Sequence, residues 1–200
     1  IKDELVAHFS AELGEGSDIN PYKEAFEILV KKEVRRSILE DGLRPDGRKG
    51  SDIRTISGEV GVLPRAHGSS IFTRGSTQAL NVTTLAPLSY AQMIDTMSEN
   101  TENRFFHHYN MPGYASGEIR RLSGPGRREI GHSALAQRAL EAVIPNEADF
   151  PYTIRTATEI MSSNGSTSMA ATCSGCMSMM DAGVPLKAPV SGIAMGLVTE

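Results

Sequence analysis

The sequence has few cysteines, no excess of positive charge and no long apolar run. Only 2 of its 200 residues are cysteine, which excludes a disulfide framework. A composition of 40% hydrophobic and 22% charged residues excludes a disordered or collagen-like chain. The 20 Lys and Arg residues are outnumbered by 24 Asp and Glu, a formal net charge of -4, so any nucleic-acid site must be local.

Signals for membrane insertion and secretion are also missing. No stretch reaches the roughly 18 apolar residues that a bilayer-spanning helix needs, and residues 1–10 lack the basic-then-apolar order of a signal peptide. We therefore expect a cytoplasmic protein. The length suits either one large domain or one domain with an appendage, and such a chain can fold without metal or disulfide. Because the sequence begins at Ile1 and ends just after an apolar run, we expect it to be a piece of a longer protein.

The first forty residues predict two helices, because apolar residues recur at three- and four-residue steps on both sides of residues 14–17. Pro21 suits the first turn of the second helix, with Asn20 before it as its cap. The turn-rich stretch 43–48 then stops the helix. We place a domain boundary there, between a helical segment at 1–42 and a second domain at 43–200.

The second domain predicts short strands and two helices without a regular repeat. Strands are expected at 58–63, 69–73, 77–85, 152–160 and 190–198, and helices at 127–144 and from about 167 to 181. This order favours an α+β fold with a mixed β-sheet and packed helices, or a mixed α/β fold.

A Ser- and Gly-rich segment between a predicted strand and a predicted helix is the best candidate for an anion site. It reads Ser162-Ser163-Asn164-Gly165-Ser166-Thr167-Ser168. Such a turn presents unpaired backbone N–H groups and the positive end of a helix dipole, so phosphate would bind well there. The segment lacks the pattern of a Walker P-loop, so ATP is not indicated. The alternative is an ordinary helix N-cap.

A second candidate is a cluster of four arginines around a Gly-Pro-Gly turn. It comprises Arg120, Arg121, Arg127 and Arg128. The planar guanidinium group pairs phosphate oxygens through two hydrogen bonds, whereas the alternative is a solvated loop or a set of subunit salt bridges. His132, four residues after Arg128, would share its helix face and reach the same anion, unless it is a structural histidine.

Other residues indicate packing or solvation more than chemistry. Cys173 and Cys176 form a CxxC pair without a second pair or a placed histidine, which favours core packing over zinc. His107 and His108 are adjacent on a predicted strand and so point to opposite faces. The basic stretch 31–36 could meet RNA, although a solvated helix face is the favoured explanation. No pair of carboxylates indicates acid–base or two-metal chemistry.

Read together, these segments resemble the polynucleotide phosphorylase family, specifically the end of its central helical domain followed by its second ribonuclease PH-like domain. The stretches that carry the resemblance are Arg44-Pro45-Asp46-Gly47-Arg48, Gly61-Val62-Leu63-Pro64-Arg65-Ala66-His67-Gly68-Ser69, Phe72-Thr73-Arg74-Gly75-Ser76-Thr77-Gln78-Ala79-Leu80, Phe106-His107-His108-Tyr109-Asn110, Arg127-Arg128-Glu129-Ile130-Gly131-His132, Phe150-Pro151-Tyr152-Thr153-Ile154-Arg155, Ser163-Asn164-Gly165-Ser166-Thr167-Ser168-Met169 and Met180-Asp181-Ala182-Gly183-Val184-Pro185. Many long motifs in the same order make the resemblance specific.

The resemblance implies a phosphate-dependent 3′→5′ exoribonuclease that releases nucleoside diphosphates, runs backward as a polymerase and serves RNA processing and mRNA degradation. It implies that Ser166, Thr167 and Ser168 hold the attacking phosphate. It also implies that Arg127, Arg128 and His132 act at phosphate and the terminal RNA linkage. Further implications are RNA as substrate, a homotrimer, Mg²⁺ as cofactor, and an RNA-degradation complex with an endoribonuclease and a helicase.

Some features depart from the family pattern. Asn110-Met111-Pro112-Gly113-Tyr114 stands where Asn-Phe-Pro-Pro-Tyr is usual, and Thr167 stands where serine is usual. The family's metal-binding aspartates would follow Glu200, so no metal ligand is expected in this chain and the isolated piece is expected to be inactive. Two alternatives stay open: a ribonuclease PH-type enzyme that trims the 3′ ends of transfer RNA, and a non-catalytic ring subunit that guides RNA.

Overall fold

The computed structural model describes residues 2–13, 18–98, 100–121 and 124–199, and the chain divides into two compact units. One unit comprises Ile1–Ile53 with Met195–Glu200, and the other comprises Arg54–Ala194. Within the described ranges, no helix combines the length and the apolar character that a membrane span requires.

The first unit contains helix α1 (Lys2–Leu13) and helix α2 (Asn20–Arg36), which continues into a π-helical turn, η1 (Ser37–Asp41). The two predicted helices are confirmed, and Pro21 lies in the first turn of α2 as expected. Asn20 was wrongly predicted as the cap, because it is the first residue of α2. Its backbone N–H donates instead to the Asp18 carboxylate over 3.0 Å.

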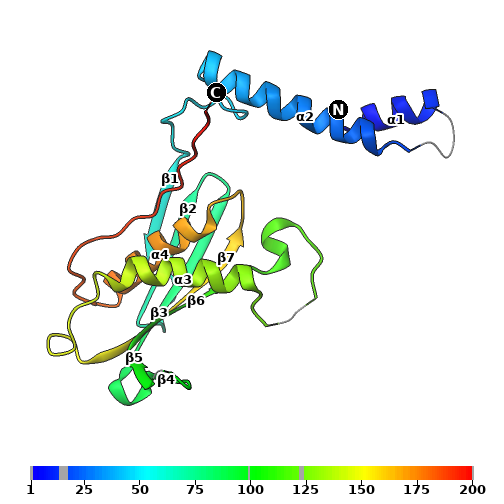
Figure 1. The fold of residues 1–200 in the computed structure, drawn as a ribbon. Coiled ribbons are helices and arrows are strands. Elements are labelled where there is room, and N and C mark those ends of the chain that lie inside the picture. The colour runs from blue at the N-terminus through cyan, green and yellow to red at the C-terminus, as the bar shows by residue number, and fades with distance from the viewer. Residues whose placement is uncertain (1, 14–17, 99, 122–123, 200) are drawn as a thin grey trace. The chain divides into compact units, whose positions relative to one another are not determined.

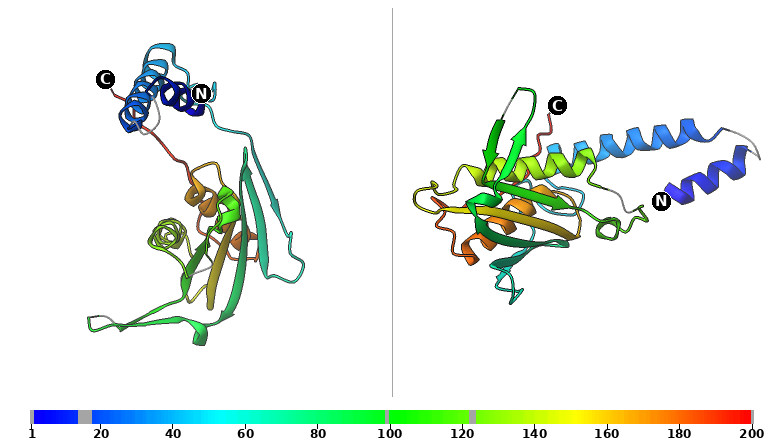
Figure 2. Two further views of the ribbon diagram at one scale, coloured as in Figure 1. Left: turned by 90° about the vertical axis from the view of Figure 1, so that its right-hand side faces the viewer. Right: turned by 90° about the horizontal axis from the view of Figure 1, so that it is seen from below.

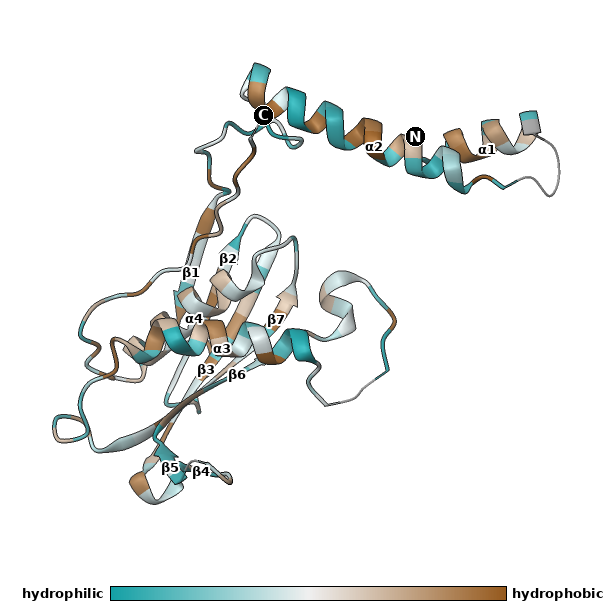
Figure 3. Cartoon of the chain, in the orientation of Figure 1, coloured by the Kyte–Doolittle hydropathy of each residue, from teal (hydrophilic) through white to brown (hydrophobic). Residues whose placement is uncertain are grey.

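Helix α2 has no buried face. None of its residues is buried, and Ile28 and Leu29 expose 64% and 63% of their surface. Figure 3 shows apolar and polar positions alternating along this helix. The contact between α1 and α2 includes the Phe9 and Tyr22 rings, whose centroids lie 4.5 Å apart. The apolar residues of α2 therefore build no core of their own.

The second unit is built on a five-stranded sheet with the order β1-β2-β3-β7-β6. Its strands are β1 (Ile56–Val60), β2 (Gly68–Arg74), β3 (Thr77–Pro87), β6 (Phe105–Asn110) and β7 (Tyr152–Ser162). Neighbours are antiparallel except β6, which runs parallel to β7. A separate two-stranded hairpin, β4 (Gln92–Asp95) and β5 (Asn100–Asn103), extends from the sheet (Figure 1).

Two helices, α3 (Arg127–Glu141) and α4 (Thr167–Asp181), cover one face of this sheet (Figure 2). Short 3₁₀ turns, η2 (Leu88–Tyr90) and η3 (Gly113–Ser116), join other elements. The α+β fold with a mixed sheet and packed helices is confirmed. Helix α3 ends three residues before the predicted end at 144, whereas α4 ends at Asp181 as expected, with Gly183 left-handed at φ 77° beyond it.

Four of the five predicted strands exist, with shifted ends. Strand β1 stops at Val60, before 63, because Gly61 turns the chain at φ 67°. The strand predicted at 190–198 is wrong: residues 190–199 have no regular structure. Part of this segment docks on α4, where the Gly192 and Val190 N–H groups donate to the sulfur atoms of Cys173 and Cys176 over 3.3 and 3.2 Å. Helix contacts thus replace strand pairing.

Helix α4 approaches the sheet closely because small residues line the contact. A Cβ atom added to Gly68 would lie 2.2 Å from the Ser178 carbonyl oxygen and 2.5 Å from the Ala182 backbone nitrogen. The backbone of β2 and the backbone of α4 therefore meet with no side chain between them.

The sheet face under the helices is polar as well as apolar. Strand β3 buries Thr77, Ala79, Asn81 and Thr83, while Leu80 and Val82 face the opposite side and are only half-buried. The buried polar groups are paired: Asn81 donates to Thr158 Oγ1 over 2.6 Å, and the Thr83 and Ser178 hydroxyls are 2.7 Å apart. Such pairing removes the penalty of burying polar groups.

Helix α3 covers the free edge of β6. Gln137 Oε1 accepts from the backbone N–H of His107 over 3.2 Å, and the Ser133 hydroxyl donates to the His107 carbonyl. These side chains satisfy backbone groups that an uncovered edge strand would leave open. The His107 ring points inward to Thr156, 2.7 Å away, whereas His108 is exposed, so the predicted opposite placement of the two histidines is confirmed.

The contact at Gly68 should tolerate no added methyl group. We expect Gly68→Ala to lower the free energy of unfolding by about 1–3 kcal/mol, because the new Cβ would meet backbone atoms of α4. Chemical denaturation measures this change. Gly131→Ala is the matched control: it adds the same atom on α3 with no neighbour within 4 Å, and should stabilise the chain by about 0.5–1 kcal/mol. Equal effects of the two variants would contradict the close packing.

Burial of the His107 ring should make stability fall in acid. Desolvation, with a smaller contribution from His108, lowers the pKa of His107 from 6.5 to about 4. Between these values the unfolded chain binds a proton that the folded chain does not, so stability is full above pH 6.5 and declines toward pH 4, by on the order of 3 kcal/mol. Thermal unfolding against pH should show this loss in wild type and in the control His67→Gln. A loss of the same size in His107→Gln would assign the acid sensitivity to other groups.

Candidate functional site

The loop between β7 and α4 has a backbone shape that is unusual for its residues. Gly165 is left-handed at φ 80°, and Ser166 follows at φ 52°, ψ 41°. Ser166 is the only residue other than glycine with positive φ in the part of the chain that the structure describes. A left-handed residue with a side chain costs roughly 1–2 kcal/mol, and such strain concentrates at functional sites.

Side chains from the β2–β3 turn hold this loop in place. Thr77 Oγ1 accepts from the Asn164 N–H over 2.9 Å and donates to the Gly165 carbonyl over 3.2 Å. Arg74 Nη2 donates to the same carbonyl over 2.7 Å. Arg54 Nη1 also donates to the Asn164 carbonyl over 3.4 Å. Three side chains thus hold the loop, and two of them belong to strands of the central sheet.

The first turn of α4 follows this loop. The first N–H groups of a helix have no partner within the helix, and the helix dipole is positive there, so an anion is favoured. Ser168 and Thr167 add hydroxyl groups to this turn, and both side chains are largely buried, with 8% and 2% of their surface exposed. Ser166 is half-buried.

The start of α3 lies beside the start of α4. The Ser168 hydroxyl contacts His132 Nδ1, and the His132 ring stacks on the Tyr109 ring with centroids 5.0 Å apart at 23°. The Tyr109 hydroxyl donates to Thr167 Oγ1 over 2.6 Å. Residues from β6, α3 and α4 therefore meet in one cluster, which comprises Tyr109, His132, Thr167 and Ser168.

Two arginines occupy the first two positions of α3 and are exposed. Arg127 and Arg128 place positive charge at the positive end of the helix dipole, which is unfavourable by about 0.3–1 kcal/mol each. Glu129 offsets this locally: it accepts from the Gly126 N–H over 3.1 Å and pairs with Arg120 over 3.5 Å. The charges of Arg127 and Arg128 themselves lie at the surface, at the start of the helix.

The electrostatic field of this cluster acts on His132. Burial lowers the pKa of His132, and the Arg128 guanidinium lowers it further, while the Glu129 carboxylate acts in the opposite direction. The neutral ring is therefore favoured in the absence of an anion. A bound anion would oppose Arg128 and favour the protonated ring.

The structure brings most of the sequence-predicted site residues together. Ser168 and His132 are in contact, Thr167 joins them through Tyr109, and Arg128 is close enough to shift the pKa of His132. Arg127 precedes Arg128 on the same helical turn. Ser162 ends β7, and Ser123, in the loop of the arginine cluster, lies outside the described residues.

Sequence reasoning missed the residues that support the site. Tyr109, Arg74 and Thr77 lie on three different strands or turns, far from the site in sequence. All three residues lie inside long motifs that carry the resemblance, but the spacing of the motifs does not indicate which residues they contact.

The other candidates of the sequence are confirmed as packing residues. Cys173 and Cys176 are free and buried in α4, and burial raises the pKa of the Cys173 thiol. Among the residues described, no group of three or more His, Cys, Asp or Glu side chains is placed to hold a metal ion.

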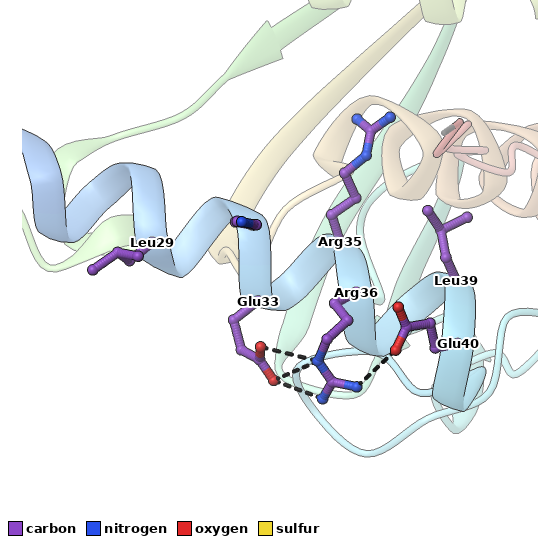
Figure 4. Close-up of a pocket in the computed structure, with 7 residues that line it drawn as sticks. Leu29, Glu33, Arg35, Arg36, Leu39 and Glu40 are labelled. Carbon is purple, nitrogen blue, oxygen red and sulfur yellow. Dashed lines mark hydrogen bonds and ion pairs between the residues drawn. The ribbon is translucent and has the colours of Figure 1, made fainter.

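The end of α2 and the η1 turn form a shallow hollow that includes Leu29, Arg35 and Leu39 (Figure 4). Arg36 is engaged within this surface: it pairs with Glu33 over 2.7 Å and with Glu40 over 3.2 Å. These ion pairs neutralise part of the positive charge for which the sequence suggested a contact with RNA.

Comparison with known proteins agrees with this architecture. Residues 52–185 match the model of the 3′ exoribonuclease family, domain 1, and residues 1–49 match the model of the polyribonucleotide nucleotidyltransferase RNA binding domain. Rice (Oryza sativa) Rrp46 has a similar fold, with a TM-score of 0.54 at 21% identity over 73% of this chain and 64% of that chain. The ribonuclease PH-like fold is thus confirmed.

Relatives in sequence are closer. The polyribonucleotide nucleotidyltransferase of Chloroflexus aurantiacus is 54% identical over 202 residues, covering 100% of this chain and 27% of the relative. That of Bacillus cereus (strain G9842) is 53% identical over 198 residues, covering 99% and 28%. The chain thus spans little more than a quarter of these relatives' length, and the resemblance to polynucleotide phosphorylase, the same enzyme under another name, is confirmed. The chain belongs to the 3′ exoribonuclease family.

Proposed function

We propose that the protein to which this chain belongs is a phosphate-dependent 3′→5′ exoribonuclease, which shortens RNA by phosphorolysis and runs backward as a 3′ polymerase. Within the chain, residues 1–42 would end a helical domain and residues 43–200 would form the catalytic ribonuclease PH-like domain. The family membership and the names of the relatives support this assignment.

The observation that carries the proposal is the meeting of two helix N-termini at one cluster of donors. Ser168 from α4 contacts His132 from α3, one turn after Arg128. Arginines at a helix N-terminus are unfavourable for the helix, but an anion bound between them and a second helix N-terminus would compensate their charge. We therefore propose Ser166, Thr167 and Ser168 as the phosphate-binding residues, with Arg127, Arg128 and His132 as catalytic residues.

The reaction does not require a covalent intermediate with the protein. An oxygen of hydrogen phosphate forms a bond to the last phosphodiester phosphorus, and the bond from that phosphorus to the preceding 3′ oxygen breaks. The proton of the hydrogen phosphate passes to that oxygen, so the products are a nucleoside diphosphate and a shortened RNA with a 3′ hydroxyl. Negative charge on the transferred group's oxygens is stabilised by positioned donors, the role we give to Arg127 and Arg128. Ser168 and the first N–H groups of α4 would hold the attacking phosphate.

Magnesium is proposed as a cofactor of the whole protein from the resemblance. The residues described here do not fit it, since they contain no cluster of ligating side chains, and we assign it no step in this chain. We also propose a cytoplasmic homotrimer that takes part in mRNA degradation and RNA processing, together with an endoribonuclease and a helicase. The match of residues 1–49 to an RNA binding domain supports RNA as the partner.

The first test is release of nucleoside diphosphate from poly(A) by the full-length protein, with and without phosphate. We expect release only with phosphate, and a loss on the order of 10²-fold or more in Arg127→Ala, Arg128→Ala, because one charge-stabilising donor contributes about that much.

Arg138→Ala is the matched control, since Arg138 is exposed in the last turn of the same helix. It should retain wild-type release. Phosphate-independent release would contradict phosphorolysis, and no release at all would favour a subunit that only guides RNA. Preference for transfer RNA 3′ ends over poly(A) would favour the trimming enzyme.

Strain at Ser166 gives a second prediction. Ser166→Gly removes the left-handed penalty along with the hydroxyl, whereas Ser166→Ala removes the hydroxyl alone. We expect both variants to weaken phosphate binding, seen as a raised KM for phosphate, while unfolding measurements show the glycine variant about 1 kcal/mol more stable than the alanine variant. An unchanged KM in both would remove the Ser166 side chain from the proposed site.

A further inference from the structure

Tyr109 is the buried centre of the cluster, although it is neither an arginine nor a member of the hydroxyl run. It exposes 3% of its surface and lies on β6, between the starts of α3 and α4. Its hydroxyl group reaches Thr167 on α4, and its ring face reaches His132 on α3. One side chain thus touches both helices that carry the proposed phosphate site.

The contact with Tyr109 sets Thr167 apart from its neighbours. Thr167 Oγ1 accepts a hydrogen bond from the Tyr109 hydroxyl over 2.6 Å, and Thr167 exposes only 2% of its surface. An anion arriving from solvent would meet Ser168 and the backbone N–H groups of the first turn before it met this hydroxyl. The Thr167 side chain is therefore directed to Tyr109, and its backbone N–H is the group left for phosphate.

The contact with His132 fixes the other half of the cluster. The stacked rings hold the imidazole so that Nδ1 faces the Ser168 hydroxyl. When Nδ1 carries a proton, it donates to Ser168 Oγ, and the Ser168 proton becomes free to donate to an anion. The direction of the Ser168 donor thus depends on how the imidazole is oriented.

We infer that Tyr109 is a positioning residue for phosphate, which anchors the first turn of α4 through Thr167 and orients His132 against Ser168. This inference rests on the proposed phosphorolytic function. It divides the hydroxyl run into an anchor, Thr167, and the donors Ser166 and Ser168. It also gives Thr167 a reason to be threonine, since an anchor needs an acceptor oxygen and a side chain that fills buried space.

The test is a double-mutant cycle on the full-length protein, with phosphorolysis of poly(A) measured against phosphate concentration. Tyr109→Phe keeps the ring and removes the hydroxyl, and Thr167→Val keeps the shape and removes the acceptor. Each should raise the KM for phosphate about fivefold, the usual effect of one hydrogen bond, with a much smaller change in kcat. The double variant should be no worse than the worse single variant, because both remove the same bond.

Two further variants separate positioning from folding. Thr167→Ser restores the acceptor oxygen and should recover most of the phosphate affinity lost in Thr167→Val. Tyr90→Phe removes a hydroxyl from an exposed tyrosine, 71% accessible in η2, and should match wild type.

Three results would overturn the inference. Fivefold effects that multiply in the double variant would show that Tyr109 and Thr167 act separately. An unchanged KM in Tyr109→Phe would show that the hydroxyl of Tyr109 does not anchor the first turn of α4 for phosphate binding. A wild type without phosphate-dependent release would overturn the proposed function itself, and this inference with it, whereas the first two results leave phosphorolysis standing.

Discussion

The close approach of α4 to the sheet is the constraint on which the rest of the second unit depends. Gly68 on β2 lets its backbone meet the backbone of α4 at a distance where a methyl group would collide, and Gly175 on α4 gives the same room to Leu140 of α3. At this separation the contact must be made by small residues, and many of them are polar. This packing therefore requires the hydrogen bonds from Asn81 to Thr158 and between Thr83 and Ser178, because an unpaired buried polar group would destabilise the fold.

The same packing fixes where chemistry can take place. Helix α4 follows β7 directly, so once α4 lies against β2 and β3 its first turn must lie at one end of the sheet. Thr77 and Arg74, at the β2–β3 turn, then bind the connecting loop from the sheet side. Strain at Ser166 is sustained by these contacts. A loop with its own freedom would relax it.

Electrostatics and packing cooperate at the start of α3. Arg127 and Arg128 are unfavourable there for the helix, and only part of that penalty is offset by Glu129. Tyr109 and Ser168 meanwhile bury one side of His132 and lower its pKa. The uncharged side chains of the cluster are thus packed and hydrogen-bonded, while positive charge is in excess beside them. We expect this combination at a site that binds an anionic substrate.

Much of this architecture was predictable from the sequence, because local rules governed it. Helices α1, α2, α3 and α4 follow apolar periodicity and the placement of Pro21 and Gly183. Local patterning failed at residues 190–198, where an apolar run resembling a buried strand docks on α4 through backbone groups and two cysteine sulfur atoms. Local patterning also does not predict which face of β3 is buried, since Asn81 and Thr83 are buried while Leu80 faces the other side.

The sequence by itself determined the family, the four helices and the two segments proposed to bind phosphate, since long motifs and helix starts are properties of neighbouring residues. Only the tertiary structure decided that these segments meet, that Tyr109 joins them and that the Thr167 hydroxyl points to protein. The reason is physical: contacts between β6, α3 and α4 are set by the closeness of helix and sheet, and no spacing along the chain encodes that distance.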